Sequence, residues 1–317
     1  MPETHLVDAI VIGGGAAGLN GALMLARSRR SVVVIDSGEP RNAPAQAVHG
    51  LLARDGTPPA ELLEQGRAEV RRYGGTVRSG EVVKAVAAEP APDGDLRFSV
   101  TLADGDTLAA RRILVATGLR DVLPDVPGVA AHWGGAVVHC PYCHGWEVRD
   151  EPIGVLATGP ASVHQALLFS QLTNDLVYLS GGTALDDDAR ARLTARGVRI
   201  VETPVDRVMS DAEGRLAGVV LADGQLVARR VLAVASRVHA RLDGLEALGL
   251  PVEDLPNGLG NRVVSGQAGT TAVPGVWVAG NVTDPSAQVG SSAAAGALAG
   301  AHINADLVTA ETEAAMA

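Results

Sequence analysis

Residues 9–18 read AIVIGGGAAG, an apolar run that ends in closely spaced glycines. The run predicts a buried strand at residues 9–12, and the pattern G-x-G-x-x-G at positions 13, 15 and 18 leads into a predicted helix. Gly13 permits a tight turn, Gly15 lets a pyrophosphate approach the backbone at the helix N-terminus, and Gly18 lets helix and strand pack closely. The pattern therefore predicts a dinucleotide-binding fold.

An acidic residue follows at the distance that such a fold requires. A second predicted strand, residues 31–35, ends at Asp36, which lies 18 residues after Gly18. Its carboxylate can accept hydrogen bonds from a ribose diol. The succession of strand, glycine loop, helix, strand and acid favours a dinucleotide site over an ordinary glycine turn. The expected cofactor contacts in this part of the chain are Gly13, Gly15, Ala16, Ala17, Gly18, Asp36 and Ser37.

Two later strands also end in glycine and a polar residue. Residues 112–118 read RILVATG, and residues 276–281 read VWVAGN. A helix of small residues is predicted from Ser291 to His302. Its N-terminus would direct backbone N–H groups towards an anion such as a reduced flavin ring, and its small residues would let it lie close to a flat cofactor. The expected contacts here are Ala116, Thr117, Gly118, Gly280, Asn281, Gln288 and Val289.

These segments resemble those of flavoproteins with two dinucleotide-binding domains, in which the first fold holds FAD. The resemblance implies FAD as the cofactor and a contact between Gly280, with its polar neighbour, and the ribityl chain. This sequence has Asn281 where those proteins have Asp, and Asn can still hydrogen-bond a hydroxyl group. Further FAD contacts are expected from Arg41, Asn42, His49 and Val83. For the first three of these, an ordinary polar surface loop is the alternative.

Residues 123–240 resemble a second domain inserted into the first. Residues 153–162 read IGVLATGPAS, so Ala157, Gly159 and Ser162 occupy the three positions of the glycine pattern. The loss of two glycines hinders the approach of a pyrophosphate. The next strand ends in Ser-Gly-Gly at 180–182, with neither an acid for an NAD ribose nor an arginine for a 2′-phosphate. NADPH is therefore doubtful as a cofactor, and a divergent loop that still binds NAD(P)H is the alternative.

The expected fold is accordingly α/β, with two Rossmann-like (ββα) dinucleotide-binding domains, the second inserted in the first. The FAD-binding domain is expected to comprise residues 1–122 and 241–317. The NAD(P)-binding-like domain is expected to comprise residues 123–240.

The chain has two cysteines, both within residues 139–145, which read HCPYCHG. Two cysteines cannot form a secreted scaffold with several disulfides, so this C-x-x-C indicates redox or metal chemistry. A disulfide between Cys140 and Cys143 would be opened by an attacking thiolate, and His144 can carry a proton near neutral pH. A zinc site and an inert buried pair are the alternatives. No second Cys or Cys/His pair completes four zinc ligands, so we expect redox chemistry and no metal.

The order of these motifs resembles the low-molecular-weight thioredoxin reductase family. In that family the C-x-x-C is usually followed by Asp-Gly, the Asp being the proton donor; here the pair is His144-Gly145. The string CPYCHGWE, residues 140–147, is more similar to a subgroup that contains dithiol oxidases of gliotoxin and holomycin biosynthesis. The resemblance implies that Cys140 reacts with a small dithiol substrate and that Cys143 faces the flavin. Electrons would then pass to FAD and on to O2, giving H2O2.

Two other functions stay open at this point. One is an NAD(P)H-dependent disulfide reductase, and the other is a non-catalytic, redox-responsive flavoprotein.

Composition and charge restrict the partners that the protein can be expected to have and its expected cellular location. The chain has 317 residues, enough for about two domains, and its net charge of −10 disfavours a nucleic-acid partner. The first apolar stretch follows Asp8 without a basic segment, and no apolar run reaches the roughly 18–20 residues of a membrane span. We therefore expect a cytoplasmic protein with no membrane partner. The family resemblance implies a homodimer.

Overall fold

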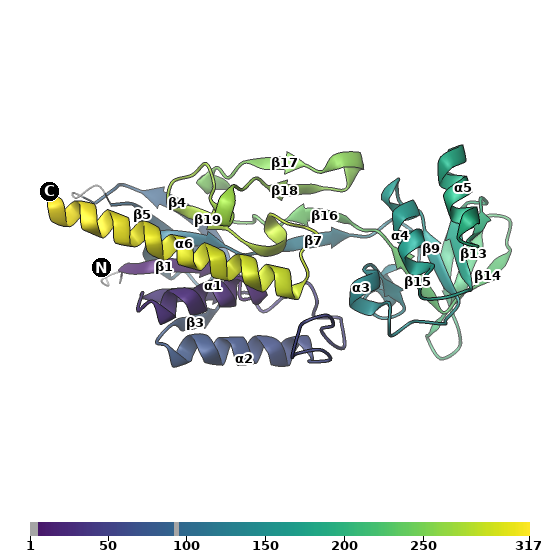
Figure 1. Cartoon of the computed structure of the whole chain (residues 1–317), viewed down its shortest axis with the longest axis horizontal. Coiled ribbons are helices and arrows are strands. Elements are labelled where there is room, and N and C mark those ends of the chain that lie inside the picture. The colour runs from purple at the N-terminus through teal and green to yellow at the C-terminus, as the bar shows by residue number, and fades with distance from the viewer. Residues whose placement is uncertain (1–5, 92–94) are drawn as a thin grey trace.

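The glycine stretch lies in the larger of two bodies, which a narrow connection joins to a smaller one (Figure 1). The structure is a computed structural model that describes residues 6–91 and 95–317. The predicted FAD-binding domain also includes residues 1–5 and 92–94, which lie outside the described residues. Both bodies combine sheets and helices, which confirms the predicted α/β class with two dinucleotide-binding folds.

The larger body is built on a seven-stranded sheet in the order β3-β2-β1-β6-β5-β4, with β19 pairing beside β6. The parallel strands are β1 (Leu6–Ile12), β2 (Val32–Asp36), β3 (Thr76–Ser79), β6 (Thr107–Val115) and β19 (Val276–Val278). The antiparallel strands are β4 (Val82–Ala88) and β5 (Arg97–Leu102). Since β19 pairs with the C-terminal part of β6, the last segment of the chain returns to the sheet that the first segment began.

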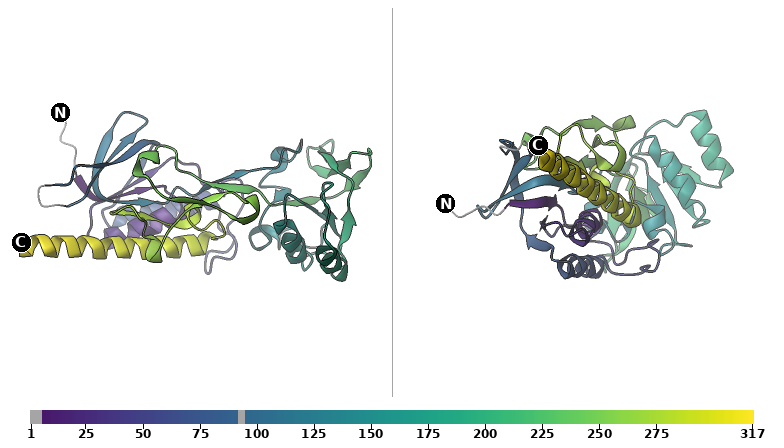
Figure 2. Two further views of the ribbon diagram at one scale, coloured as in Figure 1. Left: turned by 90° about the horizontal axis from the view of Figure 1, so that it is seen from above. Right: turned by 60° about the vertical axis from the view of Figure 1, so that its left-hand side comes forward.

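Three helices cover this sheet: α1 (Ala16–Arg27), α2 (Pro59–Arg72) and α6 (Val289–Met316). The helices α1 and α6 approach each other closely. A Cβ atom on Gly296 would lie 1.9 Å from the Ala17 carbonyl oxygen, and one on Gly300 would lie 2.4 Å from that of Gly21. Gly296 and Gly300 of α6 therefore serve close packing against α1, a use of the small residues that the sequence pattern did not predict. Figure 2 shows α6 running along the larger body, its C-terminal end pointing away from the smaller one.

The smaller body contains a five-stranded parallel sheet in the order β11-β10-β9-β15-β8 and a three-stranded antiparallel sheet. The strands of the parallel sheet are β8 (Val137–Val138), β9 (Ile153–Leu156), β10 (Leu176–Leu179), β11 (Arg199–Val201) and β15 (Val231–Val234). The antiparallel strands are β12 (Val205–Ser210), β13 (Leu216–Leu221) and β14 (Leu226–Ala228), and the helices are α3 (Pro141–His144), α4 (Ala161–Phe169) and α5 (Asp187–Ala195). The central strands are apolar and buried throughout, as expected for a parallel sheet with both faces covered.

A two-stranded antiparallel ribbon connects the bodies. It consists of β7 (Leu119–Val122), which leaves the larger body, and β16 (Arg237–Ala240), which returns to it. The predicted limits of the inserted domain, residues 123 and 240, both fall at this ribbon. The remaining short elements are β17 (Val252–Asp254), β18 (Asn261–Val263), η1 (Ala130–His132), η2 (Glu246–Leu248), η3 (Pro256–Gly258), η4 (Gln267–Gly269) and η5 (Gly280–Val282). Within the described residues, no helix is both long and apolar enough to span a bilayer.

Candidate active site

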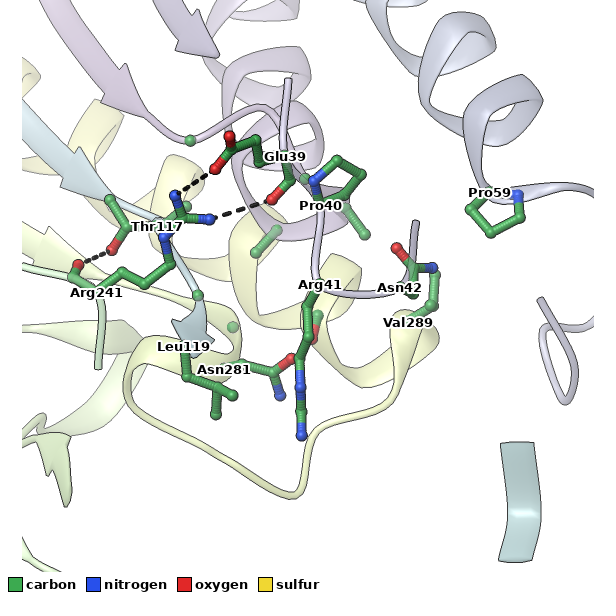
Figure 3. Close-up of a pocket in the computed structure, with 18 of the residues that line it drawn as sticks. Glu39, Pro40, Arg41, Asn42, Pro59, Thr117, Leu119, Arg241, Asn281 and Val289 are labelled. Atoms are coloured by element: carbon green, nitrogen blue, oxygen red, sulfur yellow. Dashed lines mark hydrogen bonds and ion pairs between the residues drawn. The ribbon is translucent and has the colours of Figure 1, made fainter. Parts of the chain in front are cut away.

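One pocket extends from the glycine loop of the larger body to the two cysteines of the smaller body. Most of the residues that the sequence singled out line it, although they come from distant parts of the chain. They are Gly13, Gly15, Ala16, Ala17, Asp36, Ser37, Arg41, Asn42, Ala116, Thr117, Gly118, Cys140, Cys143, His144, Gly280, Asn281, Gln288 and Val289. Figure 3 shows part of this lining, with Arg41, Thr117 and Asn281 around one region.

The glycine loop has the shape that a dinucleotide requires. Gly13 has a φ of +110°, and a Cβ there would lie 2.3 Å from the Ala116 carbonyl oxygen. Gly18 does not line the pocket, because it packs against the loop itself: its Cβ would lie 1.9 Å from the Gly13 carbonyl oxygen. A Cβ on Gly15 would have no atom within 4 Å, so the start of α1 is open to the pocket. The first-turn N–H groups of α1 carry no side-chain cap, and this end of the pocket fits the pyrophosphate of FAD.

Asp36 lies at the end of β2 and is held in place by α2. Its Oδ2 atom lies 3.2 Å from Arg67 Nη1, and its Oδ1 atom accepts the Gly38 N–H at 2.9 Å. These contacts fix the carboxylate at the edge of the pocket, where the sequence places a ribose. Arg67 was not predicted, because nothing in the spacing of a surface helix shows which of its arginines faces the neighbouring strand.

Thr117 and Arg241 tie together the segments that line the pocket (Figure 3). The Thr117 hydroxyl donates to the Arg241 carbonyl oxygen at 2.6 Å. The Arg241 guanidinium donates to the Glu39 carbonyl oxygen at 3.1 Å and lies 3.3 Å from the Glu39 carboxylate. Sequence reasoning missed Arg241 and Glu39, since their contact exists only once the chain has returned through β16.

The hydrogen bonds of Asn281 explain why this chain has asparagine where the related flavoproteins have aspartate. Its Nδ2 atom lies within hydrogen-bond distance of three carbonyl oxygens, those of Asp284 at 3.0 Å, Pro285 at 3.4 Å and Ala287 at 2.8 Å. An aspartate has no N–H to donate to these oxygens. Asn281 therefore shapes the loop that leads into α6, which begins with Gln288 as its N-cap residue.

The cysteines lie at the end of the edge strand β8. Cys140 is the N-cap residue of α3, Cys143 lies within that helix, and their Sγ atoms are 2.7 Å apart. A hydrogen bond from the Cys143 thiol lowers the pKa of Cys140 to about 6, against the effect of burial. Backbone N–H groups of α3 and the side chain of Gln288 lower it further. Cys140 is therefore the thiolate of the reduced pair.

The pKa of Cys143 is shifted in the opposite direction to that of Cys140. Its hydrogen bond to the Cys140 sulfur raises its pKa, and burial and the negative charge of Cys140 act in the same direction. The positive charge of Arg41 opposes these effects. Arg41 thus stands where it can stabilise negative charge on Cys143.

His144 follows directly and lines the same pocket. Burial lowers its pKa, although Glu147 acts to raise it and His49 acts to lower it. Its Nε2 atom is buried and has no hydrogen-bond partner among the described residues. A neutral imidazole keeps one unprotonated nitrogen and can accept a proton.

Besides Gly18, two predicted cofactor contacts, His49 and Val83, do not line the pocket. His49 lies between Asp55 of its own loop and Glu147 of the smaller body. Val83 is half exposed, whereas its neighbour Val82 is buried and lines the pocket. Consecutive side chains of a strand point to opposite faces, so the Val83 side chain points away from the pocket that Val82 lines.

The second nucleotide-like loop, residues 157–162, uses its polar groups internally. The buried Ser162 hydroxyl accepts the Thr158 N–H at 3.0 Å, and the Thr158 hydroxyl donates to the Ala235 carbonyl oxygen at 2.8 Å. Ser180, at the end of the next strand, is also buried. Within residues 6–91 and 95–317, no three His, Cys, Asp or Glu side chains gather closely enough to hold a metal ion.

Comparison with known proteins extends over nearly the whole chain. The family described as pyridine nucleotide-disulphide oxidoreductase matches residues 7–301. Thioredoxin reductase tcpT of Claviceps purpurea (strain 20.1) is 34% identical over 288 residues, which are 89% of this chain and 88% of that protein. Thioredoxin reductase sirT of Leptosphaeria maculans is 33% identical over 313 residues, 94% of each chain.

Solved structures agree with these relatives. The crystal structure of HlmI superposes with a TM-score of 0.91 and 47% identity, covering 99% of this chain and 96% of that one. An oxidoreductase from Agrobacterium tumefaciens superposes with a TM-score of 0.88 and 34% identity, covering 96% and 99%. The likeness therefore includes both bodies and the segment that carries the cysteines.

Proposed function

The chain belongs to the pyridine nucleotide-disulphide oxidoreductase family, and from this premise we propose that it is an FAD-dependent dithiol oxidase. It would close a disulfide in a small, holomycin-like dithiol natural product and transfer the electrons through FAD to O2. One observation carries the proposal: Cys140 and Cys143 line the same pocket as the glycine loop that fits a dinucleotide. The similarity to HlmI and to the C-x-x-C-H-G segment of dithiol oxidases supports it.

Two regions of the pocket would hold FAD. The glycine loop and Asp36 would bind the pyrophosphate and the adenosine ribose, while Gly280 and the start of α6 would lie beside the flavin end. Bound there, FAD would supply a two-electron acceptor that O2 can reoxidise. The chain's own residues perform the thiol chemistry.

The first step is the attack of a substrate thiolate on Cys140. A bond forms between the substrate sulfur and Cys140 Sγ, the bond to Cys143 breaks, and Cys143 leaves as a thiolate beside Arg41. His144 then accepts the proton of the second substrate thiol. That sulfur attacks the first, the product disulfide forms, and Cys140 leaves as a thiolate. A pKa of about 6 makes Cys140 a good leaving group in this step.

The electrons balance over the cycle. The reduced cysteine pair must lose two electrons to return to its disulfide. FAD held by the glycine loop and the start of α6 would supply the acceptor for them, and O2 with two protons would take them finally as H2O2. The net reaction converts one dithiol and one O2 into one disulfide and one H2O2.

An NAD(P)H-dependent disulfide reductase is the second candidate, because the family description includes a pyridine nucleotide. The inserted domain argues against it. Ala157 and Ser162 replace two glycines, Ser162 is buried within the loop, and no acid or arginine stands at residues 180–182. These features argue against binding of a nicotinamide dinucleotide at this loop.

Anaerobic titration of the FAD-loaded protein tests the proposal, with dithiothreitol, NADPH and NADH in parallel. We expect the dithiol to bleach the flavin and air to restore it, with one H2O2 formed per dithiol. A Cys140→Ala/Cys143→Ala variant controls for direct reduction of the flavin. Rapid bleaching by NADPH with none by the dithiol would overturn the proposal in favour of the reductase. Bleaching by none of the three donors would favour a non-catalytic flavoprotein.

We also propose a homodimer, which light scattering after size-exclusion chromatography would test.

A further inference from the structure

His139, which directly precedes Cys140, is held at two points within the smaller body. Its Nδ1 atom lies 3.2 Å from the Val234 carbonyl oxygen. The parallel pairing of β8 with β15 brings these two residues together, since both follow directly after the paired strand positions. The His139 carbonyl oxygen accepts an N–H of the buried Gln165 side chain, on α4, at 2.7 Å. The ring and the backbone of His139 are therefore both fixed next to Cys140.

The contact with Val234 decides which ring nitrogen carries the proton. A carbonyl oxygen only accepts hydrogen bonds, so Nδ1 of His139 is the donor. In the neutral ring Nε2 is then unprotonated and can accept a proton. Burial lowers the pKa of His139, and two ion-paired side chains of the described residues, Arg41 and Asp121, act on it in opposite directions. The ring is therefore neutral at pH 7, with its lone pair at Nε2.

This nitrogen is open to the pocket. Among the described residues, neither His139 Nε2 nor His144 Nε2 has a hydrogen-bond partner. Protein atoms enclose Nε2 of His144 but not Nε2 of His139. His139 lines the same pocket as Cys140 and Cys143. A molecule in the pocket can therefore reach an acceptor on His139 that the protein does not cover.

We propose that His139 is a catalytic residue that accepts, through Nε2, the proton of the first substrate thiol. The inference rests on the proposed function, in which the dithiol loses two protons and His144 accepts only the second. The substrate S–H bond breaks, its proton passes to Nε2, and its sulfur bonds to Cys140 Sγ. The bond from Cys140 to Cys143 breaks, and Cys143 leaves with its electron pair as a thiolate. The protons accepted by the two histidines balance the two that H2O2 contains.

This first step can be measured by itself with 2-mercaptoethanol, a monothiol that cannot go on to form an intramolecular disulfide. The oxidised, FAD-loaded protein is mixed with the monothiol and the reaction is quenched in acid. N-ethylmaleimide then alkylates the freed thiol of Cys143. Peptide mass spectrometry gives the rate at which Cys140 acquires 2-mercaptoethanol while Cys143 becomes alkylated.

His139→Asn removes the acceptor, while its amide can still donate to the Val234 carbonyl oxygen. At pH 7 we expect the adduct on Cys140 to form about 10²-fold more slowly than in the parent. The two rates should converge at about pH 10, where the monothiol is ionised without help from the protein. His164→Asn, at an exposed position of α4, is the matched control and should follow the parent throughout. If thermal melting shows that His139→Asn folds poorly, His139→Gln replaces it.

Nitrogen NMR of the FAD-loaded protein, labelled at histidine, tests the acceptor atom directly. The His139 resonances are assigned by their loss in His139→Asn. We expect a neutral ring protonated at Nδ1 at pH 7. A ring protonated at Nε2, or at both nitrogens, would leave no acceptor and would overturn the inference.

Equal adduct rates at pH 7, or a loss that persists unchanged to about pH 10, would also overturn it. So would a His139→Asn protein that loses FAD while its flavin-loaded chains react at the parental rate, since His139 would then be a cofactor contact. Formation of the mixed disulfide needs no electron transfer to the flavin, so the two proposals fail separately. A pH-dependent loss in His139→Asn, in a protein whose flavin no dithiol reduces, would support this inference and overturn the oxidase proposal.

Discussion

Arg41 and Asp121 form a two-point ion pair where the chain leaves the larger body. Arg41 Nε lies 2.6 Å from Asp121 Oδ2, and Arg41 Nη2 lies 2.7 Å from Oδ1. Asp121 is on β7, and Ser236, which precedes β16, donates to the same carboxylate at 2.6 Å. Burial alone would raise the pKa of Asp121, but Arg41 and Ser236 hold it below its ordinary value. The pair therefore fastens a pocket loop to both strands of the connecting ribbon.

Arg41→Ala should destabilise the protein. It leaves a carboxylate that is only 10% exposed without its cation, so we expect a loss of about 1–3 kcal/mol in the free energy of unfolding. Arg41→Lys keeps the charge but not the two-point geometry, so its loss in the free energy of unfolding should be smaller than that of Arg41→Ala. Urea unfolding of the FAD-loaded variants measures both. Arg192→Ala, which removes an exposed ion pair on α5, is the control and should change stability by less than about 0.5 kcal/mol. An unchanged urea midpoint for Arg41→Ala would contradict the role assigned to the pair.

The two cysteines should differ in reactivity. In the reduced protein, iodoacetamide at pH 7 should alkylate Cys140 before Cys143, because a pKa of about 6 makes Cys140 mostly thiolate at that pH. Cys143→Ala removes the largest cause of this lowering, so the midpoint of the alkylation profile for Cys140 should move to higher pH. Peptide mass spectrometry assigns the modified residue. Preferential alkylation of Cys143 would reverse the assigned order of attack.

Sequence patterns predicted the fold well where the reason was steric and local. The glycines at 13 and 18 and the apolar run before them leave few alternatives to a strand, a tight turn and a closely packed helix. The extent of α6 was underestimated, since residues 291–302 were predicted and the helix runs over Val289–Met316. Its last part is held by ion pairs of Glu311 with Arg30 and Arg111, which are 281 and 200 residues away in the chain. No local pattern contains that information.

The site was less predictable where it depends on contacts between segments. His49 has the residue type and position of a cofactor contact, yet its partner Glu147 comes from the other body. Arg67 and Arg241 look like ordinary surface arginines in the sequence, and only the folded chain brings them to Asp36 and Glu39. At Val82 and Val83 the alternation of strand faces decides which side chain lines the pocket, and the sequence alone does not fix that register.

Gly15→Ala should separate cofactor binding from folding. A Cβ on Gly15 would meet no protein atom within 4 Å, so the variant should fold normally. It would, however, fill the space over the start of α1, and we expect FAD affinity to fall by about tenfold or more, a cost of ~1.4 kcal/mol. Flavin content per chain and thermal melting of the apoprotein measure the two effects. Gly18→Ala is the contrasting variant, since its Cβ would lie 1.9 Å from a carbonyl oxygen and should impair folding itself. Full flavin loading of Gly15→Ala would argue against a pyrophosphate at this loop.

Asn281→Asp restores the residue of the related flavoproteins but should destabilise this one. The substitution replaces an N–H donor shared by three carbonyl oxygens with a carboxylate that repels them. We expect a loss of about 1–3 kcal/mol, measured by urea unfolding, together with weaker flavin binding because the loop leads directly into α6. Asn42→Asp, a like change at another residue of the pocket, is the control. Equal stability of Asn281→Asp and the parent would mean that the three contacts contribute little.

Asp95 should make the stability of the larger body sensitive to acid. Its carboxylate accepts hydrogen bonds from Arg111 at 2.6 Å, Arg97 at 2.5 Å and Arg112 at 3.0 Å. Burial would raise its pKa, but the three guanidinium groups, Arg112 foremost, lower it from 3.8 to about 2. A folded-state pKa below the unfolded value contributes stability that is complete above about pH 4 and is lost as the pH falls through about 2.

Asp95→Asn tests this contribution directly. At pH 7 the variant should unfold with about 2 kcal/mol less free energy than the parent, and this difference should shrink towards zero between pH 4 and pH 2. Urea unfolding at several pH values measures it. Glu69→Gln, on the exposed face of α2, is the control and should follow the parent throughout. A difference that stays constant down to pH 2 would show that the substituted amide disturbs packing, and that the ionised form of Asp95 is not what stabilises the fold.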